Sequence, residues 1–121
     1  MLGANNFLNI AVKLITHHDA ITFLNIVLSI EEQLGRKHNH LSLKYESRPI
    51  DIDILFYGSS VIQTSRLTVP HPRLHERKFV LTPLCEIASD FTHPVFQKTI
   101  ETLSLECQDQ LETTILKAYI S

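Results

Sequence analysis

The sequence predicts one domain that mixes helices and strands, because both kinds of periodicity occur within its 121 residues. In residues 48–57 the apolar side chains alternate with polar ones up to Ile54 and then run on without a break to Gly58, which is typical of a strand with one buried face. Residues 20–34 have apolar side chains at helical spacing. The length is enough for one small hydrophobic core, so we expect a single domain over residues 1–121.

The composition excludes several classes of protein. A net charge of −2 argues against nucleic-acid binding driven by bulk positive charge. No apolar run approaches membrane-spanning length, and the first residues lack a basic segment followed by a cleavage site. We therefore expect a cytoplasmic protein without nucleic-acid or membrane partners. Cys85 and Cys107 are far apart in the sequence and are expected to be buried, reduced thiols.

The first elements are predicted to be a strand and a helix. Residues 7–16 are rich in aliphatic side chains and indicate a buried strand, with Asn9 hydrogen-bonded to a neighbouring loop. Asp19 is the expected N-cap of the helix over residues 20–34, and Gly35 its expected end. The predicted inward stripe of this helix consists of Leu24, Val27, Leu28 and Leu34.

Glu31 falls on the same side of the helix as this apolar stripe. A carboxylate in such a position needs a partner, because burying it unpaired is costly. Two partners are open at this point. One is an arginine of the fold, and the other is a group of a bound ligand.

The predicted strand at residues 48–57 carries two acids on one face. Asp51 and Asp53 are two residues apart, so their side chains point to the same side, with Cα atoms about 7 Å apart. Two neighbouring carboxylates repel each other unless a positive charge neutralises them, and oxygen ligands suit Mg²⁺. The alternative is a solvated strand face with two surface acids.

A basic segment precedes these acids. Its polar and basic residues are predicted to form a loop over residues 36–47, with Arg36 at its start and Arg48 immediately after it. An acidic metal site beside arginines suits a polyphosphate, because metal and guanidinium groups neutralise different oxygens. His38 and His40 are candidate metal ligands, and their ordinary role in a polar loop is solvation.

A second group of basic residues follows the strand. After a turn at residues 58–60, residues 61–63 and 67–69 are predicted to be either two short strands of a hairpin or an excursion of the chain. His71 lies between Pro70 and Pro72, which stiffen the backbone on both sides. The nearby arginines are Arg66, Arg73 and Arg77, so we expect a second anion-binding patch; the alternative is an exposed loop histidine.

The last part of the chain is predicted to be helical. Residues 76–88 form a helix bent near Pro83, and residues 97–116 form another, with a turn at residues 92–95 between them. Phe79 is expected either in the core or in a pocket lining. The other predicted core residues are Leu81, Leu84, Cys85, Ile87, Ile100, Leu103 and Leu111.

Four segments occur together in one order and carry a resemblance. They are FLN at 7–9, IEEQLGR at 30–36, SRPIDIDILFYG at 47–58 and LTVPHPRLHERKFVLTPLCEIA at 67–88. Together they resemble the 6-hydroxymethyl-7,8-dihydropterin pyrophosphokinase family, over nearly the whole chain. The resemblance implies an α+β fold with a ferredoxin-like core, in which helices flank an antiparallel sheet. It also implies Mg²⁺-dependent transfer of pyrophosphate from ATP to 6-hydroxymethyl-7,8-dihydropterin in folate biosynthesis, giving AMP.

The resemblance also assigns roles to individual residues. It implies that Asp51 and Asp53 hold two Mg²⁺ ions that bridge the oxygens of ATP. The implied catalytic residues are Arg36, Arg48, Asp51 and Asp53. The implied ATP-binding residues are Glu31, Arg66, Thr68, His71 and Arg77. The implied pterin-binding residues are Phe7, Asn9, Asp51 and Phe79.

The chain departs from the family pattern in several places. No strand–helix–strand segment precedes Phe7, so we expect an N-terminally truncated member with an open sheet edge. Lys37 and His38 stand where the family has a second arginine, in a loop that is longer. Glu46 replaces a small residue and Leu28 a polar one. One alternative function is therefore an impaired family member that self-associates or pairs with a partner; a metal-dependent nuclease or nucleotidyl transferase is disfavoured by the negative charge.

Overall fold

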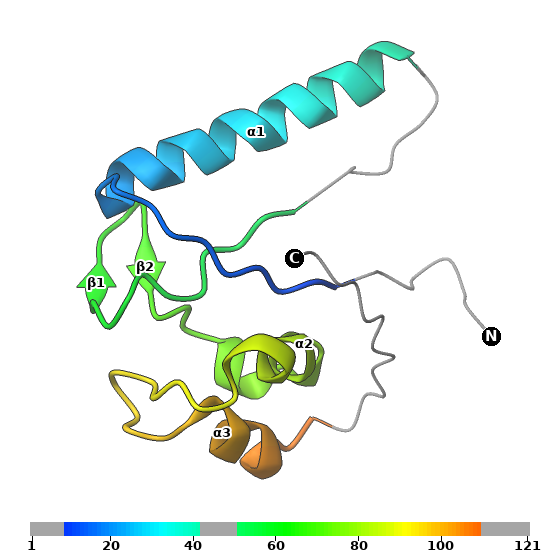
Figure 1. Cartoon of the computed structure of the whole chain (residues 1–121). Helices are drawn as coiled ribbons and strands as arrows, with labels where there is room; N and C mark the ends of the chain where they lie inside the picture. The colour runs from blue at the N-terminus through cyan, green and yellow to red at the C-terminus, as the bar shows by residue number, and fades with distance from the viewer. Residues whose placement is uncertain (1–8, 42–50, 110–121) are drawn as a thin grey trace, which may run out of the picture. The chain divides into compact units, whose positions relative to one another are not determined.

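The computed structural model describes residues 9–41 and 51–109, with side chains for residues 9–35 and 51–109. The elements in chain order are α1 (Ala20–Leu41), β1 (Ile62–Gln63), β2 (Thr68–Val69), the 3₁₀ helix η1 (Leu74–Glu76), α2 (Lys78–Ala88) and α3 (Ile100–Glu106) (Figure 1). Helices and an antiparallel sheet occur together, so the predicted α+β class is confirmed. No helix within these residues is both long and apolar enough to cross a membrane.

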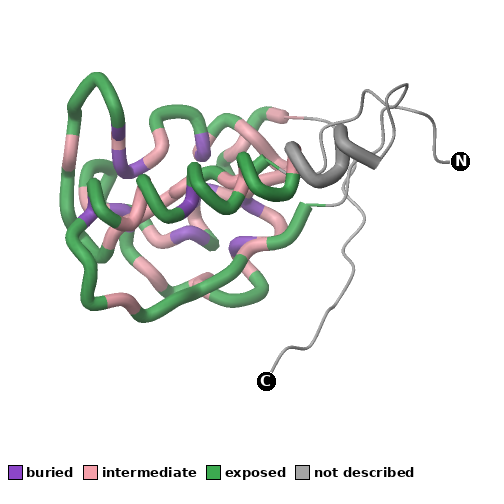
Figure 2. The backbone as a smooth tube through the Cα atoms, turned by 90° about the horizontal axis from the view of Figure 1, so that it is seen from above, coloured by how far each residue is buried: buried purple, intermediate pink, exposed green. Residues whose placement is uncertain are grey.

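The chain divides into two compact units. We call Ile15–His71 the hairpin unit, and Met1–Leu14 with Pro72–Ser121 the helical unit. Buried residues are few and are scattered along the described backbone, most of which is exposed or half-buried (Figure 2). The single domain over residues 1–121 stays a prediction.

Helix α1 of the hairpin unit begins where the sequence predicts. The Oδ1 atom of Asp19 accepts a hydrogen bond from the backbone N–H of Thr22 at 2.8 Å, which confirms the N-cap. The backbone N–H of Thr22, followed by its side chain, lowers the pKa of the Asp19 carboxyl. The predicted end at Gly35 is wrong, because α1 continues to Leu41. Gly35 lacks the positive φ of a glycine C-cap, and an interior glycine weakens a helix without ending it.

The two short strands confirm the predicted hairpin. β1 and β2 are antiparallel, with Ile62 opposite Val69 and Gln63 opposite Thr68. The connecting turn is closed by Thr64, whose backbone N–H donates to the Leu67 carbonyl at 2.9 Å. The hydroxyl oxygen of Thr64 accepts from the N–H of Leu67 at 3.0 Å. Figure 1 shows this hairpin beside the N-terminal end of α1.

A small core joins α1, the hairpin and residues 54–57. Its buried members are Ala20, Leu67 and Val69, and the half-buried Leu24, Ile54, Tyr57 and Ile62 pack against them. The Tyr57 hydroxyl also donates to the His18 carbonyl, just before α1. The predicted helix stripe is only partly buried: Val27 is 5% exposed, whereas Leu28 and Leu34 are 46% and 40% exposed.

Two predicted strands are not strands in the structure. Residues 9–16 and 51–57 lie outside every ladder, and pairing in the described residues is limited to β1 with β2 and a bridge between Thr92 and Thr99. Residues 9–16 are also mostly exposed rather than buried, with Ile10, Val12 and Leu14 more than half exposed. An apolar pattern predicts which side chains are favourable to bury, but a strand also needs a neighbouring strand to pair with, which the pattern does not predict.

The helical unit is built from η1, α2 and α3. The helix predicted over residues 76–88 is found as α2, which contains Pro83 and buries Leu81 and Leu84. The prediction was wrong for Ile87, which is 42% exposed. Cys85 and Cys107 are free thiols, and both are half-buried rather than fully buried. The backbone N–H of Lys78 donates to Oδ2 of Asp109 at 3.0 Å, which ties the start of α2 to the segment after α3.

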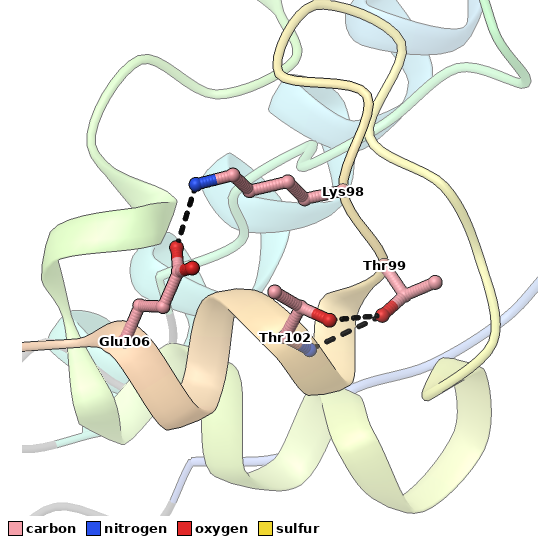
Figure 3. Close-up of polar contacts among 4 residues, drawn as sticks. All are labelled: Lys98, Thr99, Thr102 and Glu106. Atoms are coloured by element: carbon pink, nitrogen blue, oxygen red, sulfur yellow. Dashed lines mark hydrogen bonds and ion pairs between the residues drawn. The ribbon is translucent and has the colours of Figure 1, made fainter.

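Helix α3 is shorter than predicted. It begins at Ile100, because Thr99 is the N-cap and its Oγ1 accepts from the N–H of Thr102 at 3.1 Å (Figure 3). It ends at Glu106, since Cys107 has an extended backbone. Ile100 and Leu103 are buried as predicted, and Leu111 lies outside the described residues. The ion pair of Lys98 with Glu106 at 2.8 Å lies on the surface, where such pairs stabilise little (Figure 3).

Candidate functional site

The segment 51–56, which we call the acid segment, keeps the predicted alternation although it is not a strand. Asp51 and Asp53 are exposed, whereas Ile52 and Ile54 are half-buried. Ile54 packs against the small core of the hairpin unit. The isoleucine side chains therefore hold the segment against the unit, and both carboxylates lie on its solvent side.

Glu31 of α1 binds the acid segment near its start. Its Oε2 atom accepts a hydrogen bond from the backbone N–H of Ile52 at 2.6 Å. Among the described residues, Glu31 thus has a backbone amide of the acid segment as a partner.

His71 is tied to the other end of the acid segment. Its backbone N–H donates to the carbonyl oxygen of Leu55 at 2.9 Å, and its side chain is half-buried. The predicted phosphate-binding histidine and the two acids therefore belong to one hydrogen-bonded piece of the hairpin unit. Two main-chain anchors define this piece: Ile52 bonded to α1, and Leu55 bonded to His71.

Arg66 and Thr68 belong to the same unit. Arg66 is exposed in the hairpin turn, and its guanidinium donates to the side-chain oxygen of Asn25 on α1. Thr68 lies in β2 and is half-buried. Asn25 was missed by sequence reasoning, because its contact joins residues 41 positions apart and no local pattern indicates it. The structure thus brings six predicted residues into one unit: Glu31, Asp51, Asp53, Arg66, Thr68 and His71.

The other described candidates lie in the helical unit. The guanidinium carbon of Arg77 is 5.8 Å from the centre of the Phe79 ring, a cation–π contact that orients both side chains. Arg73 bonds to Glu76 at 3.1 Å, and both side chains are exposed. Asn9 is exposed, and the hydrogen bond predicted for it stays a prediction.

Some candidates lie outside the described residues. Phe7 and Arg48 are among these, and so is the side chain of Arg36, although its backbone is part of α1. The loop predicted over residues 36–47 is corrected in part, because α1 extends to Leu41 and includes His38 and His40.

The residues of the acid segment suit a metal that arrives with a phosphate ligand. Across the described parts of the chain, no three His, Cys, Asp or Glu side chains form a group that could hold a metal ion. Magnesium is commonly bound by one or two carboxylates, with water and substrate phosphates completing its shell. Two exposed carboxylates on one side of an anchored segment fit that kind of site, and they do not form an all-protein cage.

Comparison with known proteins finds one family. Residues 1–89 match the family described as 7,8-dihydro-6-hydroxymethylpterin-pyrophosphokinase. A protein of Aquifex aeolicus named 2-amino-4-hydroxy-6-hydroxymethyldihydropteridine pyrophosphokinase is 39% identical over 101 residues, which cover 84% of this chain and 61% of that protein. The protein of the same name from Haemophilus influenzae is 38% identical over 89 residues, 74% of this chain and 54% of that protein.

A plant protein is similar as well. The "Folate synthesis bifunctional protein" of Arabidopsis thaliana is 43% identical over 81 residues, which cover 67% of this chain and 16% of that protein. The chain therefore matches less than two thirds of the length of each of these relatives. The range matched by the family includes the acid segment, the hairpin and His71.

Proposed function

Because the chain belongs to the 7,8-dihydro-6-hydroxymethylpterin-pyrophosphokinase family, we propose that it binds ATP with Mg²⁺ and transfers pyrophosphate to 6-hydroxymethyl-7,8-dihydropterin. The observation that carries this proposal is the pair of exposed acids, Asp51 and Asp53, on a segment anchored to α1 through Ile52. The names of the relatives support a role in folate synthesis.

In this proposal Asp51 and Asp53 hold two Mg²⁺ ions together with oxygens of ATP. Magnesium supplies positive charge that neutralises the polyphosphate and polarises its phosphoryl oxygens. The two carboxylates orient that charge, because the half-buried Ile52 and Ile54 keep both of them on the solvent side of the acid segment.

The basic and polar residues act on the polyphosphate. Arg66, Thr68 and His71 of the hairpin unit are proposed to donate hydrogen bonds to it, and Arg77 is proposed to add a guanidinium. The hydroxymethyl oxygen of the pterin attacks the β-phosphorus of ATP. The bond from this phosphorus to the oxygen that bridges to the α-phosphate breaks, and AMP leaves with that oxygen. Donors near the bridging oxygen stabilise the negative charge that develops there.

The remaining roles concern the basic segment and the pterin. Arg36 and Arg48 are proposed to contact the polyphosphate as it reacts. Phe7 and Phe79 are proposed to stack on the two faces of the pterin ring, because aromatic faces bind a flat heterocycle well. Asn9 and Asp51 are proposed to hydrogen-bond its edge.

Calorimetric titration with α,β-methylene ATP tests this proposal, because that analogue replaces the bond that the reaction cleaves. We expect Mg²⁺-dependent binding that Asp53→Asn and Asp51→Asn each weaken at least about tenfold, since metal sites depend strongly on individual ligands and their partners. Asp90→Asn is the matched control, because Asp90 is an exposed aspartate of the helical unit. Binding that is independent of Mg²⁺, or equal in all three variants, would contradict the proposal.

A second candidate function follows from the exposure of residues 9–16. Ile10, Val12 and Leu14 are 57%, 65% and 64% exposed, which is unusual for aliphatic side chains at alternate positions. A family member that turns over little ATP and associates through this segment, with a copy of itself or with a partner, would cover them. Light scattering after size-exclusion chromatography distinguishes this candidate, because a stable monomer would count against self-association.

A further inference from the structure

The hydrogen bond between Glu31 and Ile52 holds the backbone directly between the two acids. Ile52 is the residue between Asp51 and Asp53, so its backbone sets the direction of both neighbouring side chains. The bond spans 21 residues of sequence and joins α1 directly to this backbone, with Oε2 of Glu31 2.6 Å from the amide nitrogen. Any shift of the Glu31 carboxylate would therefore be transmitted to both acids.

The anchor matters because the acid segment lies outside every strand ladder in the described residues. In a sheet, a neighbouring strand would fix such a segment through several backbone hydrogen bonds. Here the backbone is tied to other elements at Ile52, through Glu31, and at Leu55, through the N–H of His71 at 2.9 Å. The first of these two anchors is the one that lies between the acids.

The hydrogen bond to Ile52 also gives Glu31 a role different from that of the proposed metal ligands Asp51 and Asp53. A third carboxylate beside Asp51 and Asp53 would add repulsion unless it had a counter-charge or a donor. Glu31 has its donor in the Ile52 amide, and among the described residues these three acids do not gather into one metal-holding group. Glu31 thus binds the backbone between the two acids and can orient them without binding the metal, as the outer hydrogen-bond partners of metal ligands do.

We propose that Glu31 is a positioning residue: its carboxylate fixes the Ile52 backbone so that Asp51 and Asp53 are held ready for Mg²⁺, and it does not contact the nucleotide. This inference rests on the proposed function, and it replaces the direct ATP contact that the family resemblance implies for Glu31. Its consequence is specific. Loss of Glu31 should raise the Mg²⁺ concentration that nucleotide binding requires, and should leave binding at saturating Mg²⁺ nearly unchanged.

The test uses the full chain and three variants of Glu31. Glu31→Ala removes the acceptor, Glu31→Asp keeps the charge but shortens the side chain, and Glu31→Gln keeps an acceptor oxygen at the same reach. Glu86→Ala is the matched control, because Glu86 is an exposed glutamate of α2. Circular dichroism of each variant verifies folding before any binding is compared.

The first measurement needs neither metal nor nucleotide. The amide proton of Ile52 should resonate downfield in the ¹H–¹⁵N spectrum, because it donates to a carboxylate at short distance. We expect an upfield shift in Glu31→Ala and Glu31→Asp, a smaller upfield shift in Glu31→Gln, whose acceptor is neutral, and little change in Glu86→Ala. An unchanged Ile52 amide in Glu31→Ala would overturn the inference.

The second measurement is the affinity for α,β-methylene ATP as a function of Mg²⁺. For Glu31→Ala and Glu31→Asp we expect about tenfold more Mg²⁺ at half-maximal binding, in line with other outer hydrogen-bond partners of metal sites. Glu31→Gln and Glu86→Ala should match the parent protein. A weakening that persists at saturating Mg²⁺ would indicate direct nucleotide contact and overturn the inference, as would an unchanged Mg²⁺ requirement.

The third measurement separates failure of the inference from failure of the proposed function. If the parent protein does not bind the nucleotide analogue, the proposed function fails, and Mn²⁺ alone then serves as the probe. Mn²⁺ should broaden the resonances of Asp51 and Asp53 in the parent protein at concentrations that leave Glu31→Ala unaffected. Equal broadening in both proteins, or none in the parent, would overturn the positioning role.

Discussion

The turn after α2 contains a buried histidine whose protonation should weaken the fold. His93 is 3% exposed, and its Nδ1 atom accepts hydrogen bonds from the backbone N–H groups of Val95 and Phe96, both at 3.1 Å. Its ring stacks on Phe96 with centroids 4.3 Å apart. Nδ1 can accept these bonds only while it carries no proton, so the folded turn requires neutral His93.

The structure also gives the sign of the pH effect. Burial, followed by the charge of His75, lowers the pKa of His93 from its ordinary value of about 6.5. Between that value and the lower folded pKa, the unfolded chain binds more protons than the folded chain. The free energy of unfolding should therefore fall as the pH decreases through this window, by at most about 1.4 kcal/mol per pH unit for this one group.

His93→Phe removes the acceptor and keeps an aromatic ring against Phe96. At about pH 7.5 we expect a loss of about 1–3 kcal/mol of unfolding free energy, because two hydrogen bonds of about 0.5–1.5 kcal/mol each are lost. The contribution of His93 to the pH dependence should vanish as well. Hence the variant should lose less stability on acidification than the parent protein does.

Urea unfolding between about pH 5 and about pH 8, followed by circular dichroism, measures both effects. His17→Phe is the matched control, because it makes the same substitution at an exposed histidine. If His93→Phe were as stable as the parent at about pH 7.5, or kept the parent's full dependence on pH, the reasoning would be refuted.

Two further predictions concern the helices. Ile100→Ala should lower the free energy of unfolding in urea by about 2–5 kcal/mol, because Ile100 is 0% exposed. Leu105→Ala on the same helix should lower it by less than about 0.5 kcal/mol, because Leu105 is 80% exposed. Equal losses in the two variants would mean that the packing of α3 is misassigned. Asp19→Ala should reduce the helical circular dichroism of α1, and Asp19→Asn should retain it. Because the pKa of Asp19 is lowered in the fold, the parent should lose this stabilisation as the pH falls through the folded pKa, and a parent insensitive to acid in that range would count against the cap.

Features set by neighbouring residues were predictable from the sequence. The cap at Asp19, the hairpin of β1 and β2, and the burial of Ile100 and Leu103 all depend on contacts or periodicities within a few residues. The placement of Asp51 and Asp53 on one side of their segment depends only on alternation, which the structure retains.

The remainder depended on partners distant in sequence or on backbone conformation. Alternation in residues 51–54 indicates correctly which side chains are less exposed, but it implies a strand ladder that the described residues do not form. The contact of Glu31 with Ile52 joins residues 21 positions apart, so no local pattern could reveal it. The residue type of Gly35 predicts a helix end, yet Gly35 lacks the left-handed conformation in which a glycine closes a helix.

The central claim is that the acids of residues 51–53 hold Mg²⁺ with ATP for pyrophosphate transfer. The most direct measurement is the release of AMP from ATP by the full chain, with and without added 6-hydroxymethyl-7,8-dihydropterin and Mg²⁺. We predict AMP release that requires both additions and is abolished by Asp53→Ala but retained by Asp90→Asn. AMP release that does not depend on the pterin, or that is unchanged in Asp53→Ala, would contradict the claim.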